Sequence, residues 1–116
     1  MSSEKPLIIA VAGLGQRIAV VLRHLVAAAP QARIAGYVDP EPFGLASLAK
    51  RNIDAGKVYG DVATMLAETK PDLFVIGSPN HLHLTHIKAG FAAGVRIFTE
   101  KPIVRTEEET WELARL

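Results

Sequence analysis

The chain has 116 residues, of which 49% are hydrophobic and 22% charged, a size and composition that suit one globular domain. Its 13 basic and 12 acidic residues leave a net charge of +1, which gives no electrostatic reason to expect nucleic acid or an anionic membrane as a partner. The absence of cysteine excludes disulfides and thiolate metal sites, and no apolar run approaches the roughly 18 residues that span a bilayer. We therefore expect a cytoplasmic protein.

Short apolar runs rich in Val and Ile alternate with longer segments of helical periodicity. In chain order, we expect a strand at Leu7–Ala12, a helix from Ile18 to Leu25, a strand at Arg33–Val38, a helix at Phe43–Lys50 and a weak strand at Lys57–Tyr59. A helix from an N-cap at Asp61 to Leu66, a strand at Asp72–Ile76, a helix through Leu84, Ile87 and Phe91 to a stop at Gly94, and a strand at Val95–Phe98 follow. A last helix is expected after the capping box Thr106/Glu109, with Trp111 in the core. This order predicts an α/β fold, a doubly wound parallel sheet of the Rossmann type with about five strands. Its ligand is expected beyond the carboxyl ends of the strands.

The first predicted strand runs directly into a glycine-containing turn. Gly13 permits the tight turn, and Gly15 has no side chain to keep the backbone away from a pyrophosphate, which the helix N-terminus attracts. Ile18 stands where the dinucleotide fingerprint has its third glycine, so we expect it to push the helix outward or to shift its first turn. Phosphate contact would then rely on Gly15, Gln16 and Arg17, although Arg17 fits a solvated helix face equally well.

Asp39 ends the second predicted strand, 24 residues after Gly15, close to the spacing of about 20 at which an acidic residue meets the adenosine ribose. A carboxylate there accepts hydrogen bonds from the ribose hydroxyls and repels a 2′-phosphate, so it favours NAD over NADP. The alternative is a turn residue before Pro40. We prefer the dinucleotide interpretation because the glycine turn and Asp39 occur together.

Two further segments follow the fourth and fifth predicted strands: Gly77-Ser78-Pro79-Asn80-His81-Leu82-His83 and Thr99-Glu100-Lys101-Pro102. With the Gly13/Gly15 turn, Val38-Asp39, Pro79-Asn80-x-x-His83, the Ala-rich helix ending at Gly94 and Glu100-Lys101-Pro102, the chain resembles the N-terminal domain of the glucose–fructose oxidoreductase/inositol dehydrogenase (Gfo/Idh/MocA) family over nearly its whole length.

The resemblance implies an enzyme that transfers a hydride between a nicotinamide cofactor and a sugar- or polyol-like alcohol. It implies that Lys101 is the catalytic lysine beside the substrate hydroxyl, a role that suits an ammonium group because it stabilises a developing alkoxide. The local sequence alone fits a surface lysine equally well. The residues that would line the cofactor pocket are Ser78, Pro79, Asn80, His83, Glu100 and Lys101.

Three histidines close together, His81, His83 and His86, invite a metal site. We expect none, because no carboxylate ligand lies beside them and a helix that places His83 and His86 on one face turns His81 away. His24 is expected to be a partly exposed helix residue.

In the family the domain continues with a sixth strand, and a larger α+β domain supplies most substrate contacts. We therefore expect this chain to be a fragment, inactive alone, that takes a small-molecule substrate only with that domain. Its fifth strand would be an unpaired edge, so self-association through Val95–Phe98 or the last helix is expected. Two other functions stay open: a non-catalytic dinucleotide sensor on the same fold, and NAD-dependent glycoside cleavage.

Overall fold

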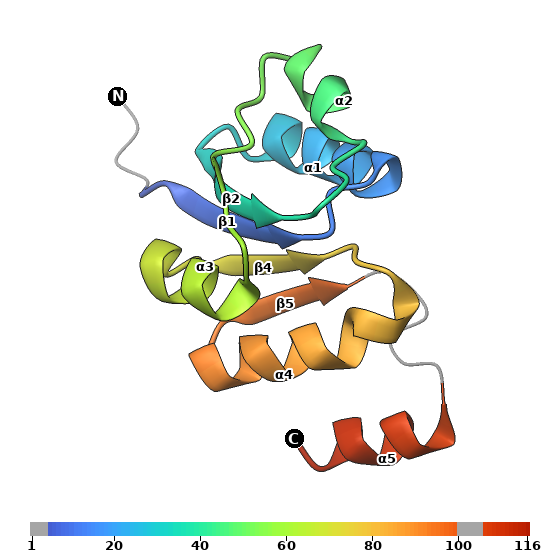
Figure 1. The fold of residues 1–116 in the computed structure, drawn as a ribbon. Coiled ribbons are helices and arrows are strands. Elements are labelled where there is room, and N and C mark those ends of the chain that lie inside the picture. The colour runs from blue at the N-terminus through green and yellow to red at the C-terminus, as the bar shows by residue number, and fades with distance from the viewer. Residues whose placement is uncertain (1–4, 100–105) are drawn as a thin grey trace.

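The computed structural model describes residues 5–99 and 106–116, in which five parallel strands form one sheet in the order β3-β2-β1-β4-β5 (Figure 1). The strands are β1 (Leu7–Ala12), β2 (Ala32–Val38), β3 (Lys57–Val58), β4 (Leu73–Ile76) and β5 (Arg96–Thr99). The helices are α1 (Gln16–Ala28), α2 (Leu45–Ala49), α3 (Val62–Thr69), the 3₁₀ turn η1 (Asn80–Leu82), α4 (His83–Ala93) and α5 (Glu107–Ala114). The predicted doubly wound Rossmann sheet is confirmed.

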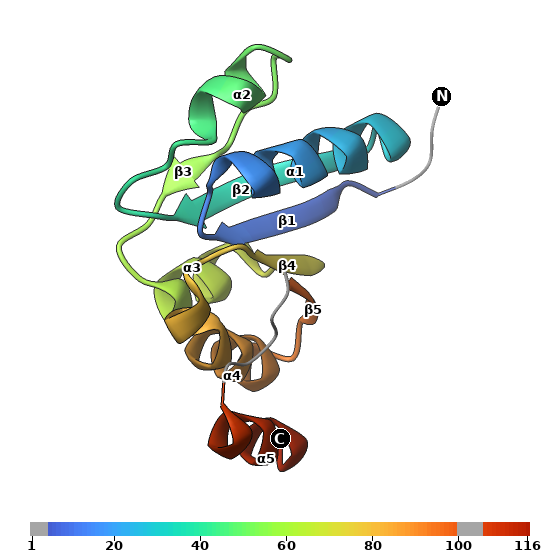
Figure 2. The ribbon, with the colours of Figure 1, turned by 90° about the vertical axis from the view of Figure 1, so that its right-hand side faces the viewer.

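The central strand β1 distributes its side chains between two helical layers. Ile9 and Val11 pack in the cluster under α1 and α2, whereas Ala10 and Ala12 pack in the cluster under α3 and α4, and all four are fully buried. This division follows from the two-residue period of a strand. Both faces of β1 are therefore apolar, and helices cover the sheet on both sides, as Figures 1 and 2 show.

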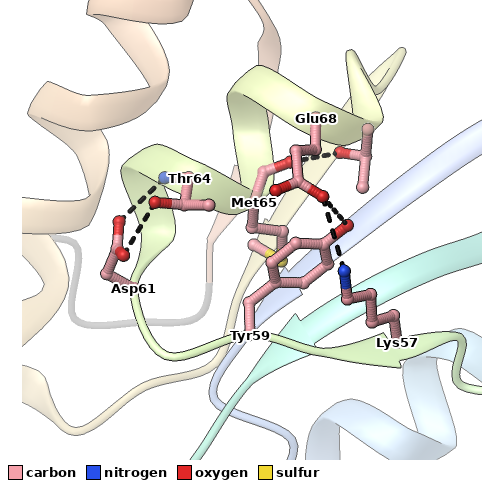
Figure 3. Close-up of polar contacts among 7 residues, drawn as sticks. Lys57, Tyr59, Asp61, Thr64, Met65 and Glu68 are labelled. Carbon is pink, nitrogen blue, oxygen red and sulfur yellow. Dashed lines mark hydrogen bonds and ion pairs between the residues drawn. The ribbon is translucent and has the colours of Figure 1, made fainter.

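Helix α3 starts as the sequence predicts and continues three residues beyond the predicted end at Leu66. Asp61 accepts hydrogen bonds from the backbone N–H and the hydroxyl of Thr64, both at 2.8 Å (Figure 3). The carboxylate of Glu68, one turn later on α3, accepts a hydrogen bond from the Tyr59 hydroxyl at 3.2 Å and lies 3.6 Å from the Lys57 ammonium. These contacts tie the short edge strand β3 to the helix that follows it.

Element ends differ from prediction where the sequence signal is weak. Helix α2 begins at Leu45, two residues after Phe43, because Phe43 and Gly44 form a turn before it. Strand β5 is shifted by one residue to Arg96–Thr99, since Gly94 ends α4 in a left-handed conformation (φ 70°) and Val95 still donates to Gly90.

The last helix does not enter the core. Its N-cap is the predicted one, with the Thr106 hydroxyl accepting from the Glu109 N–H, but Trp111 is 61% exposed. The expectation that Trp111 is a core contact is wrong, because α5 meets the rest of the domain at its margin, through Leu113 and the Lys88–Glu112 ion pair. Phe91, expected on the buried stripe of α4, is also exposed.

No helix within the described ranges is both long enough and apolar enough to cross a bilayer.

Candidate functional site

Gly13 closes the turn after β1 in a conformation and a space that suit glycine alone. Its φ is +83°, and a Cβ on it would lie 2.2 Å from the backbone nitrogen of Ser78. Its own N–H donates to the Val38 carbonyl at 2.8 Å. The turn is therefore wedged between the carboxyl ends of β2 and β4, and Gly13 is required by the protein's own packing.

Gly15 stands in contrast to Gly13. It is the N-cap of α1 with an ordinary φ of −85°, and a Cβ on it would meet nothing within 4 Å. No side chain caps the helix, and the first turn contains no acidic residue. Because the first N–H groups of a helix lack partners within it, α1 presents donors and the positive end of its dipole to an open space.

The missing third glycine of the turn is compensated by a glycine directly after β4. Ile18 is 1% exposed, and its Cγ1 occupies the place that a side chain on Gly77 would take, 1.9 Å from an ideal Cβ there. The expected shift of the helix is not observed: α1 begins at Gln16, and Ala19 donates to Gly15 at 3.0 Å in a regular first turn. Sequence reasoning missed Gly77, whose only signal was a glycine directly after β4.

Asp39 locks the loops at the ends of β1 and β2 together. Its Oδ2 accepts from the Leu14 N–H at 2.6 Å, and its Oδ1 accepts from the Glu41 N–H at 2.8 Å. The loop then returns to the glycine turn, where Gly44 donates to the Leu14 carbonyl at 2.9 Å. The half-buried carboxylate thus has a structural role, and each oxygen keeps a further lone pair for a ligand hydroxyl.

The sheet register brings the predicted site segments to one edge. Ala12, the last residue of β1, is level with Val38 of β2 and with Ile76 of β4. The glycine turn, Asp39 and the Ser78-Pro79-Asn80 segment therefore follow adjacent strand ends. Of the remaining predicted residues, those with exposed side chains are Gln16, Arg17, Pro79 and Asn80.

The two histidines on the inner face of α4 hold the segment after β4. His83 is 1% exposed and its Nε2 lies 2.7 Å from the Ser78 carbonyl, while His86 Nδ1 shares a 2.8 Å hydrogen bond with the Ser78 hydroxyl. Burial lowers the pKa of His86, and the adjacent His83 lowers it further. His81 is exposed, and no group of three potential ligands in residues 5–99 and 106–116 could hold a metal.

Three residues of the predicted site, Glu100, Lys101 and Pro102, lie outside the described residues. Strand β5 ends just before them at Thr99, which is level with Ile76 of β4. Their roles therefore stay predictions.

Comparison with known proteins gives consistent matches along the chain. Residues 7–116 match a family described as an oxidoreductase family with an NAD-binding Rossmann fold. D-glucoside 3-dehydrogenase of Escherichia coli (strain K12) is 28% identical over 111 residues, which are 96% of this chain and 31% of that enzyme. This chain spans about a third of the length of that relative.

Two solved structures share both the fold and a quarter of the sequence. Myo-inositol 2-dehydrogenase from Lactobacillus plantarum aligns with a TM-score of 0.79 and 26% identity over 96% of this chain and 32% of that one. Scyllo-inositol dehydrogenase from Lactobacillus casei, solved with NAD(H) and scyllo-inositol, aligns with a TM-score of 0.79 and 25% identity over the same shares.

Proposed function

The chain belongs to the oxidoreductase family with an NAD-binding Rossmann fold that is called Gfo/Idh/MocA, and on this premise we propose that it binds NAD across the carboxyl ends of β1, β2 and β4. The observation that carries the proposal is the open face of Gly15 at the uncapped N-terminus of α1. A pyrophosphate there would receive the first N–H groups of the helix, with Gln16 and Arg17 beside it.

The residues of the chain fit the cofactor. The glycine turn is held in place without a ligand, so the cost of ordering it is met during folding. Asp39 is fixed by two backbone donors and offers its remaining lone pairs to the ribose hydroxyls. The segment from Ser78 to Asn80, anchored by His83, would line the side of the site toward the nicotinamide.

We propose that Asp39 makes the chain prefer NAD to NADP, because a carboxylate repels a 2′-phosphate. Calorimetric titration of each cofactor should give tighter binding of NAD, and Asp39→Ser should narrow the difference. Asp54→Ser is a matched control, since Asp54 also accepts a hydrogen bond from a loop N–H, that of Gly56, but precedes β3 and so does not lie at the carboxyl ends of the strands. Equal affinities for the two cofactors, or a preference for NADP, would remove Asp39 from the cofactor site.

In the whole protein we propose hydride transfer between NAD and a sugar- or polyol-like alcohol. The relatives named above are dehydrogenases of a glucoside and of inositols, which supports this substrate class. The bound nicotinamide would supply the hydride acceptor or donor. Lys101 would stabilise the alkoxide that develops on the substrate and relay its proton.

Lys101→Ala separates catalysis from cofactor binding. We expect NAD affinity within a few-fold of the native value and a severe loss of kcat in the whole enzyme, because the lysine acts on the substrate and not on the cofactor. Stopped-flow and steady-state kinetics would measure both. Near-normal turnover in Lys101→Ala would remove Lys101 from the reaction.

A further inference from the structure

A polar cavity lies between α1 and α2, apart from the open face of Gly15. It has a volume of about 320 Å³, within the range of small-ligand sites. Gln16 and Arg23 contribute from α1, where a spacing of seven residues puts them on one face two turns apart. Ser47, Lys50 and Arg51 contribute from α2 and the turn after it. We call this cavity the α1–α2 pocket.

The charge of the α1–α2 pocket is unbalanced. Its lining contains three cations, Arg23, Lys50 and Arg51, and no acidic residue. None of the three forms an ion pair with a residue of the described ranges. Cations of one sign gathered in a concave space concentrate anions from solution.

Arg23 provides the observation that points to a ligand. It is half-buried, and its Nη1 donates to the Ser47 hydroxyl at 3.2 Å. Its Nε is fully buried and has no hydrogen-bond partner among residues 5–99 and 106–116. A buried donor without an acceptor is destabilising, so an anion that accepts from the guanidinium would stabilise the pocket.

We propose that the α1–α2 pocket binds a phosphate-bearing anion through Arg23, Lys50 and Arg51. Arginine forks match the oxygens of a phosphate. The pocket borders the proposed cofactor site, because Gln16 opens α1 and Phe43, 67% exposed on the rim, belongs to the loop that starts at Asp39. Because Asp39 is proposed to repel the 2′-phosphate of NADP, we assign the pocket to a separate phosphate ester, and the 2′-phosphate is the other source that the test distinguishes.

Inorganic phosphate is the first probe, titrated into the protein at constant ionic strength and followed by NMR. We expect the Arg23 Nε–H signal to move and saturate, and Arg51→Gln to weaken phosphate binding by about tenfold, as loss of one charge-assisted contact does. Arg33→Gln, which removes the same charge from an exposed position on β2 outside the pocket, should leave the affinity unchanged. Shifts that do not saturate, or equal weakening by the two variants, would overturn the proposal.

Calorimetry with the two cofactors then identifies the source of the phosphate. If Arg51→Gln weakens binding of NADP and spares NAD, the pocket holds the 2′-phosphate. If phosphate still binds to the NAD-saturated protein and NADP affinity is unchanged by Arg51→Gln, the pocket holds a separate ester. The phosphate titration needs no dinucleotide, so failure of the chain to bind NAD leaves the result for this pocket intact.

Discussion

The two halves of the sheet, β3-β2-β1 and β4-β5, differ in how fully the segments around them are held in place. Around β1 and β2, the loops are joined by hydrogen bonds from Gly13 to Val38, from Leu14 to Asp39 and from Gly44 to Leu14, all at 2.9 Å or less. Beyond β4, apolar side chains face outward, and α5 buries no residue. The exposed residues on this side are Phe91 at 54%, Phe98 at 43%, Trp111 at 61% and Leu116 at 50%.

This difference shows which of the two surfaces is held in its shape by contacts within the domain. The proposed nucleotide site is held by contacts within the domain, so its geometry exists before a ligand arrives. On the side of β5 and α5, four large apolar side chains of the described residues are exposed. Where such side chains form a continuous patch, they mark a contact with other protein. We therefore expect changes near the glycine turn to affect folding strongly and changes on the far side to affect association.

The largest effect is expected at Gly13. Gly13→Ala combines a left-handed φ with a backbone clash, so the free energy of unfolding should fall by at least about 3 kcal/mol. Gly15→Ala is the matched control: with open space and an ordinary φ, it should cost no more than about 1 kcal/mol as a poorer N-cap, while NAD binding weakens. Urea denaturation and calorimetry measure the two effects. Equal destabilisation by both variants would mean that Gly15 also serves the fold.

A somewhat smaller effect should link Gly77 and Ile18. Gly77→Ala places a methyl group on the Ile18 side chain and should cost about 2 kcal/mol, an ordinary price for overpacking. In an Ile18→Ala background that cost should shrink, giving a coupling of about 1 kcal/mol in a double-mutant cycle. Additive losses would show that Gly77 is needed for another reason, such as its approach to the Gly13 carbonyl.

A weaker effect on stability is expected when the pH is lowered and His86 takes up a proton. Because its pKa is lowered on folding, the folded state favours the neutral ring, so stability is full above the ordinary pKa of about 6.5 and falls as pH drops through the lowered value. His86→Gln should flatten this part of the pH profile, measured by thermal unfolding between neutral and mildly acidic pH. His81→Gln, at an exposed position, should leave the profile as it is. A profile unchanged by His86→Gln would assign the pH dependence elsewhere.

The smallest effect on folding is expected at Trp111. Trp111→Ser should change the unfolding free energy by less than about 0.5 kcal/mol, as exposed substitutions usually do. We expect the native chain to self-associate through this helix or the β5 edge, which has a paired neighbour on one side only within the described residues, and Trp111→Ser to weaken that association. Sedimentation over a wide concentration range measures it. A native chain that stays monomeric up to the millimolar range would contradict the expectation.

Sequence reasoning succeeded where the signal is local. The glycine turn, the position of Asp39 at the end of β2 and the caps at Asp61 and Thr106 depend on neighbours a few residues apart, and each is found as predicted. Element order and the parallel sheet follow from periodicity. These features position the proposed site without any knowledge of packing between distant segments.

The errors concern contacts between segments far apart in the sequence. Ile18 was expected to disturb α1 because it stands in place of a glycine. The residue that makes room for it, Gly77, lies 59 residues away, and no local pattern connects the two. Trp111 was expected in the core, yet α5 lies at the margin of the domain and leaves it exposed.

The exchange between Ile18 and Gly77 restricts the order in which substitutions at these two positions are tolerated. Starting from a fingerprint glycine at position 18, a bulky residue fits there only once position 77 lacks a side chain, whereas glycine at 77 is compatible with either residue at 18. The permissive step is therefore the glycine that follows β4, and a side chain can return to position 77 only after the residue at position 18 has become smaller. In an alignment, a large residue at 18 should accompany glycine at 77, and a search that demands three glycines in the turn would pass over such chains.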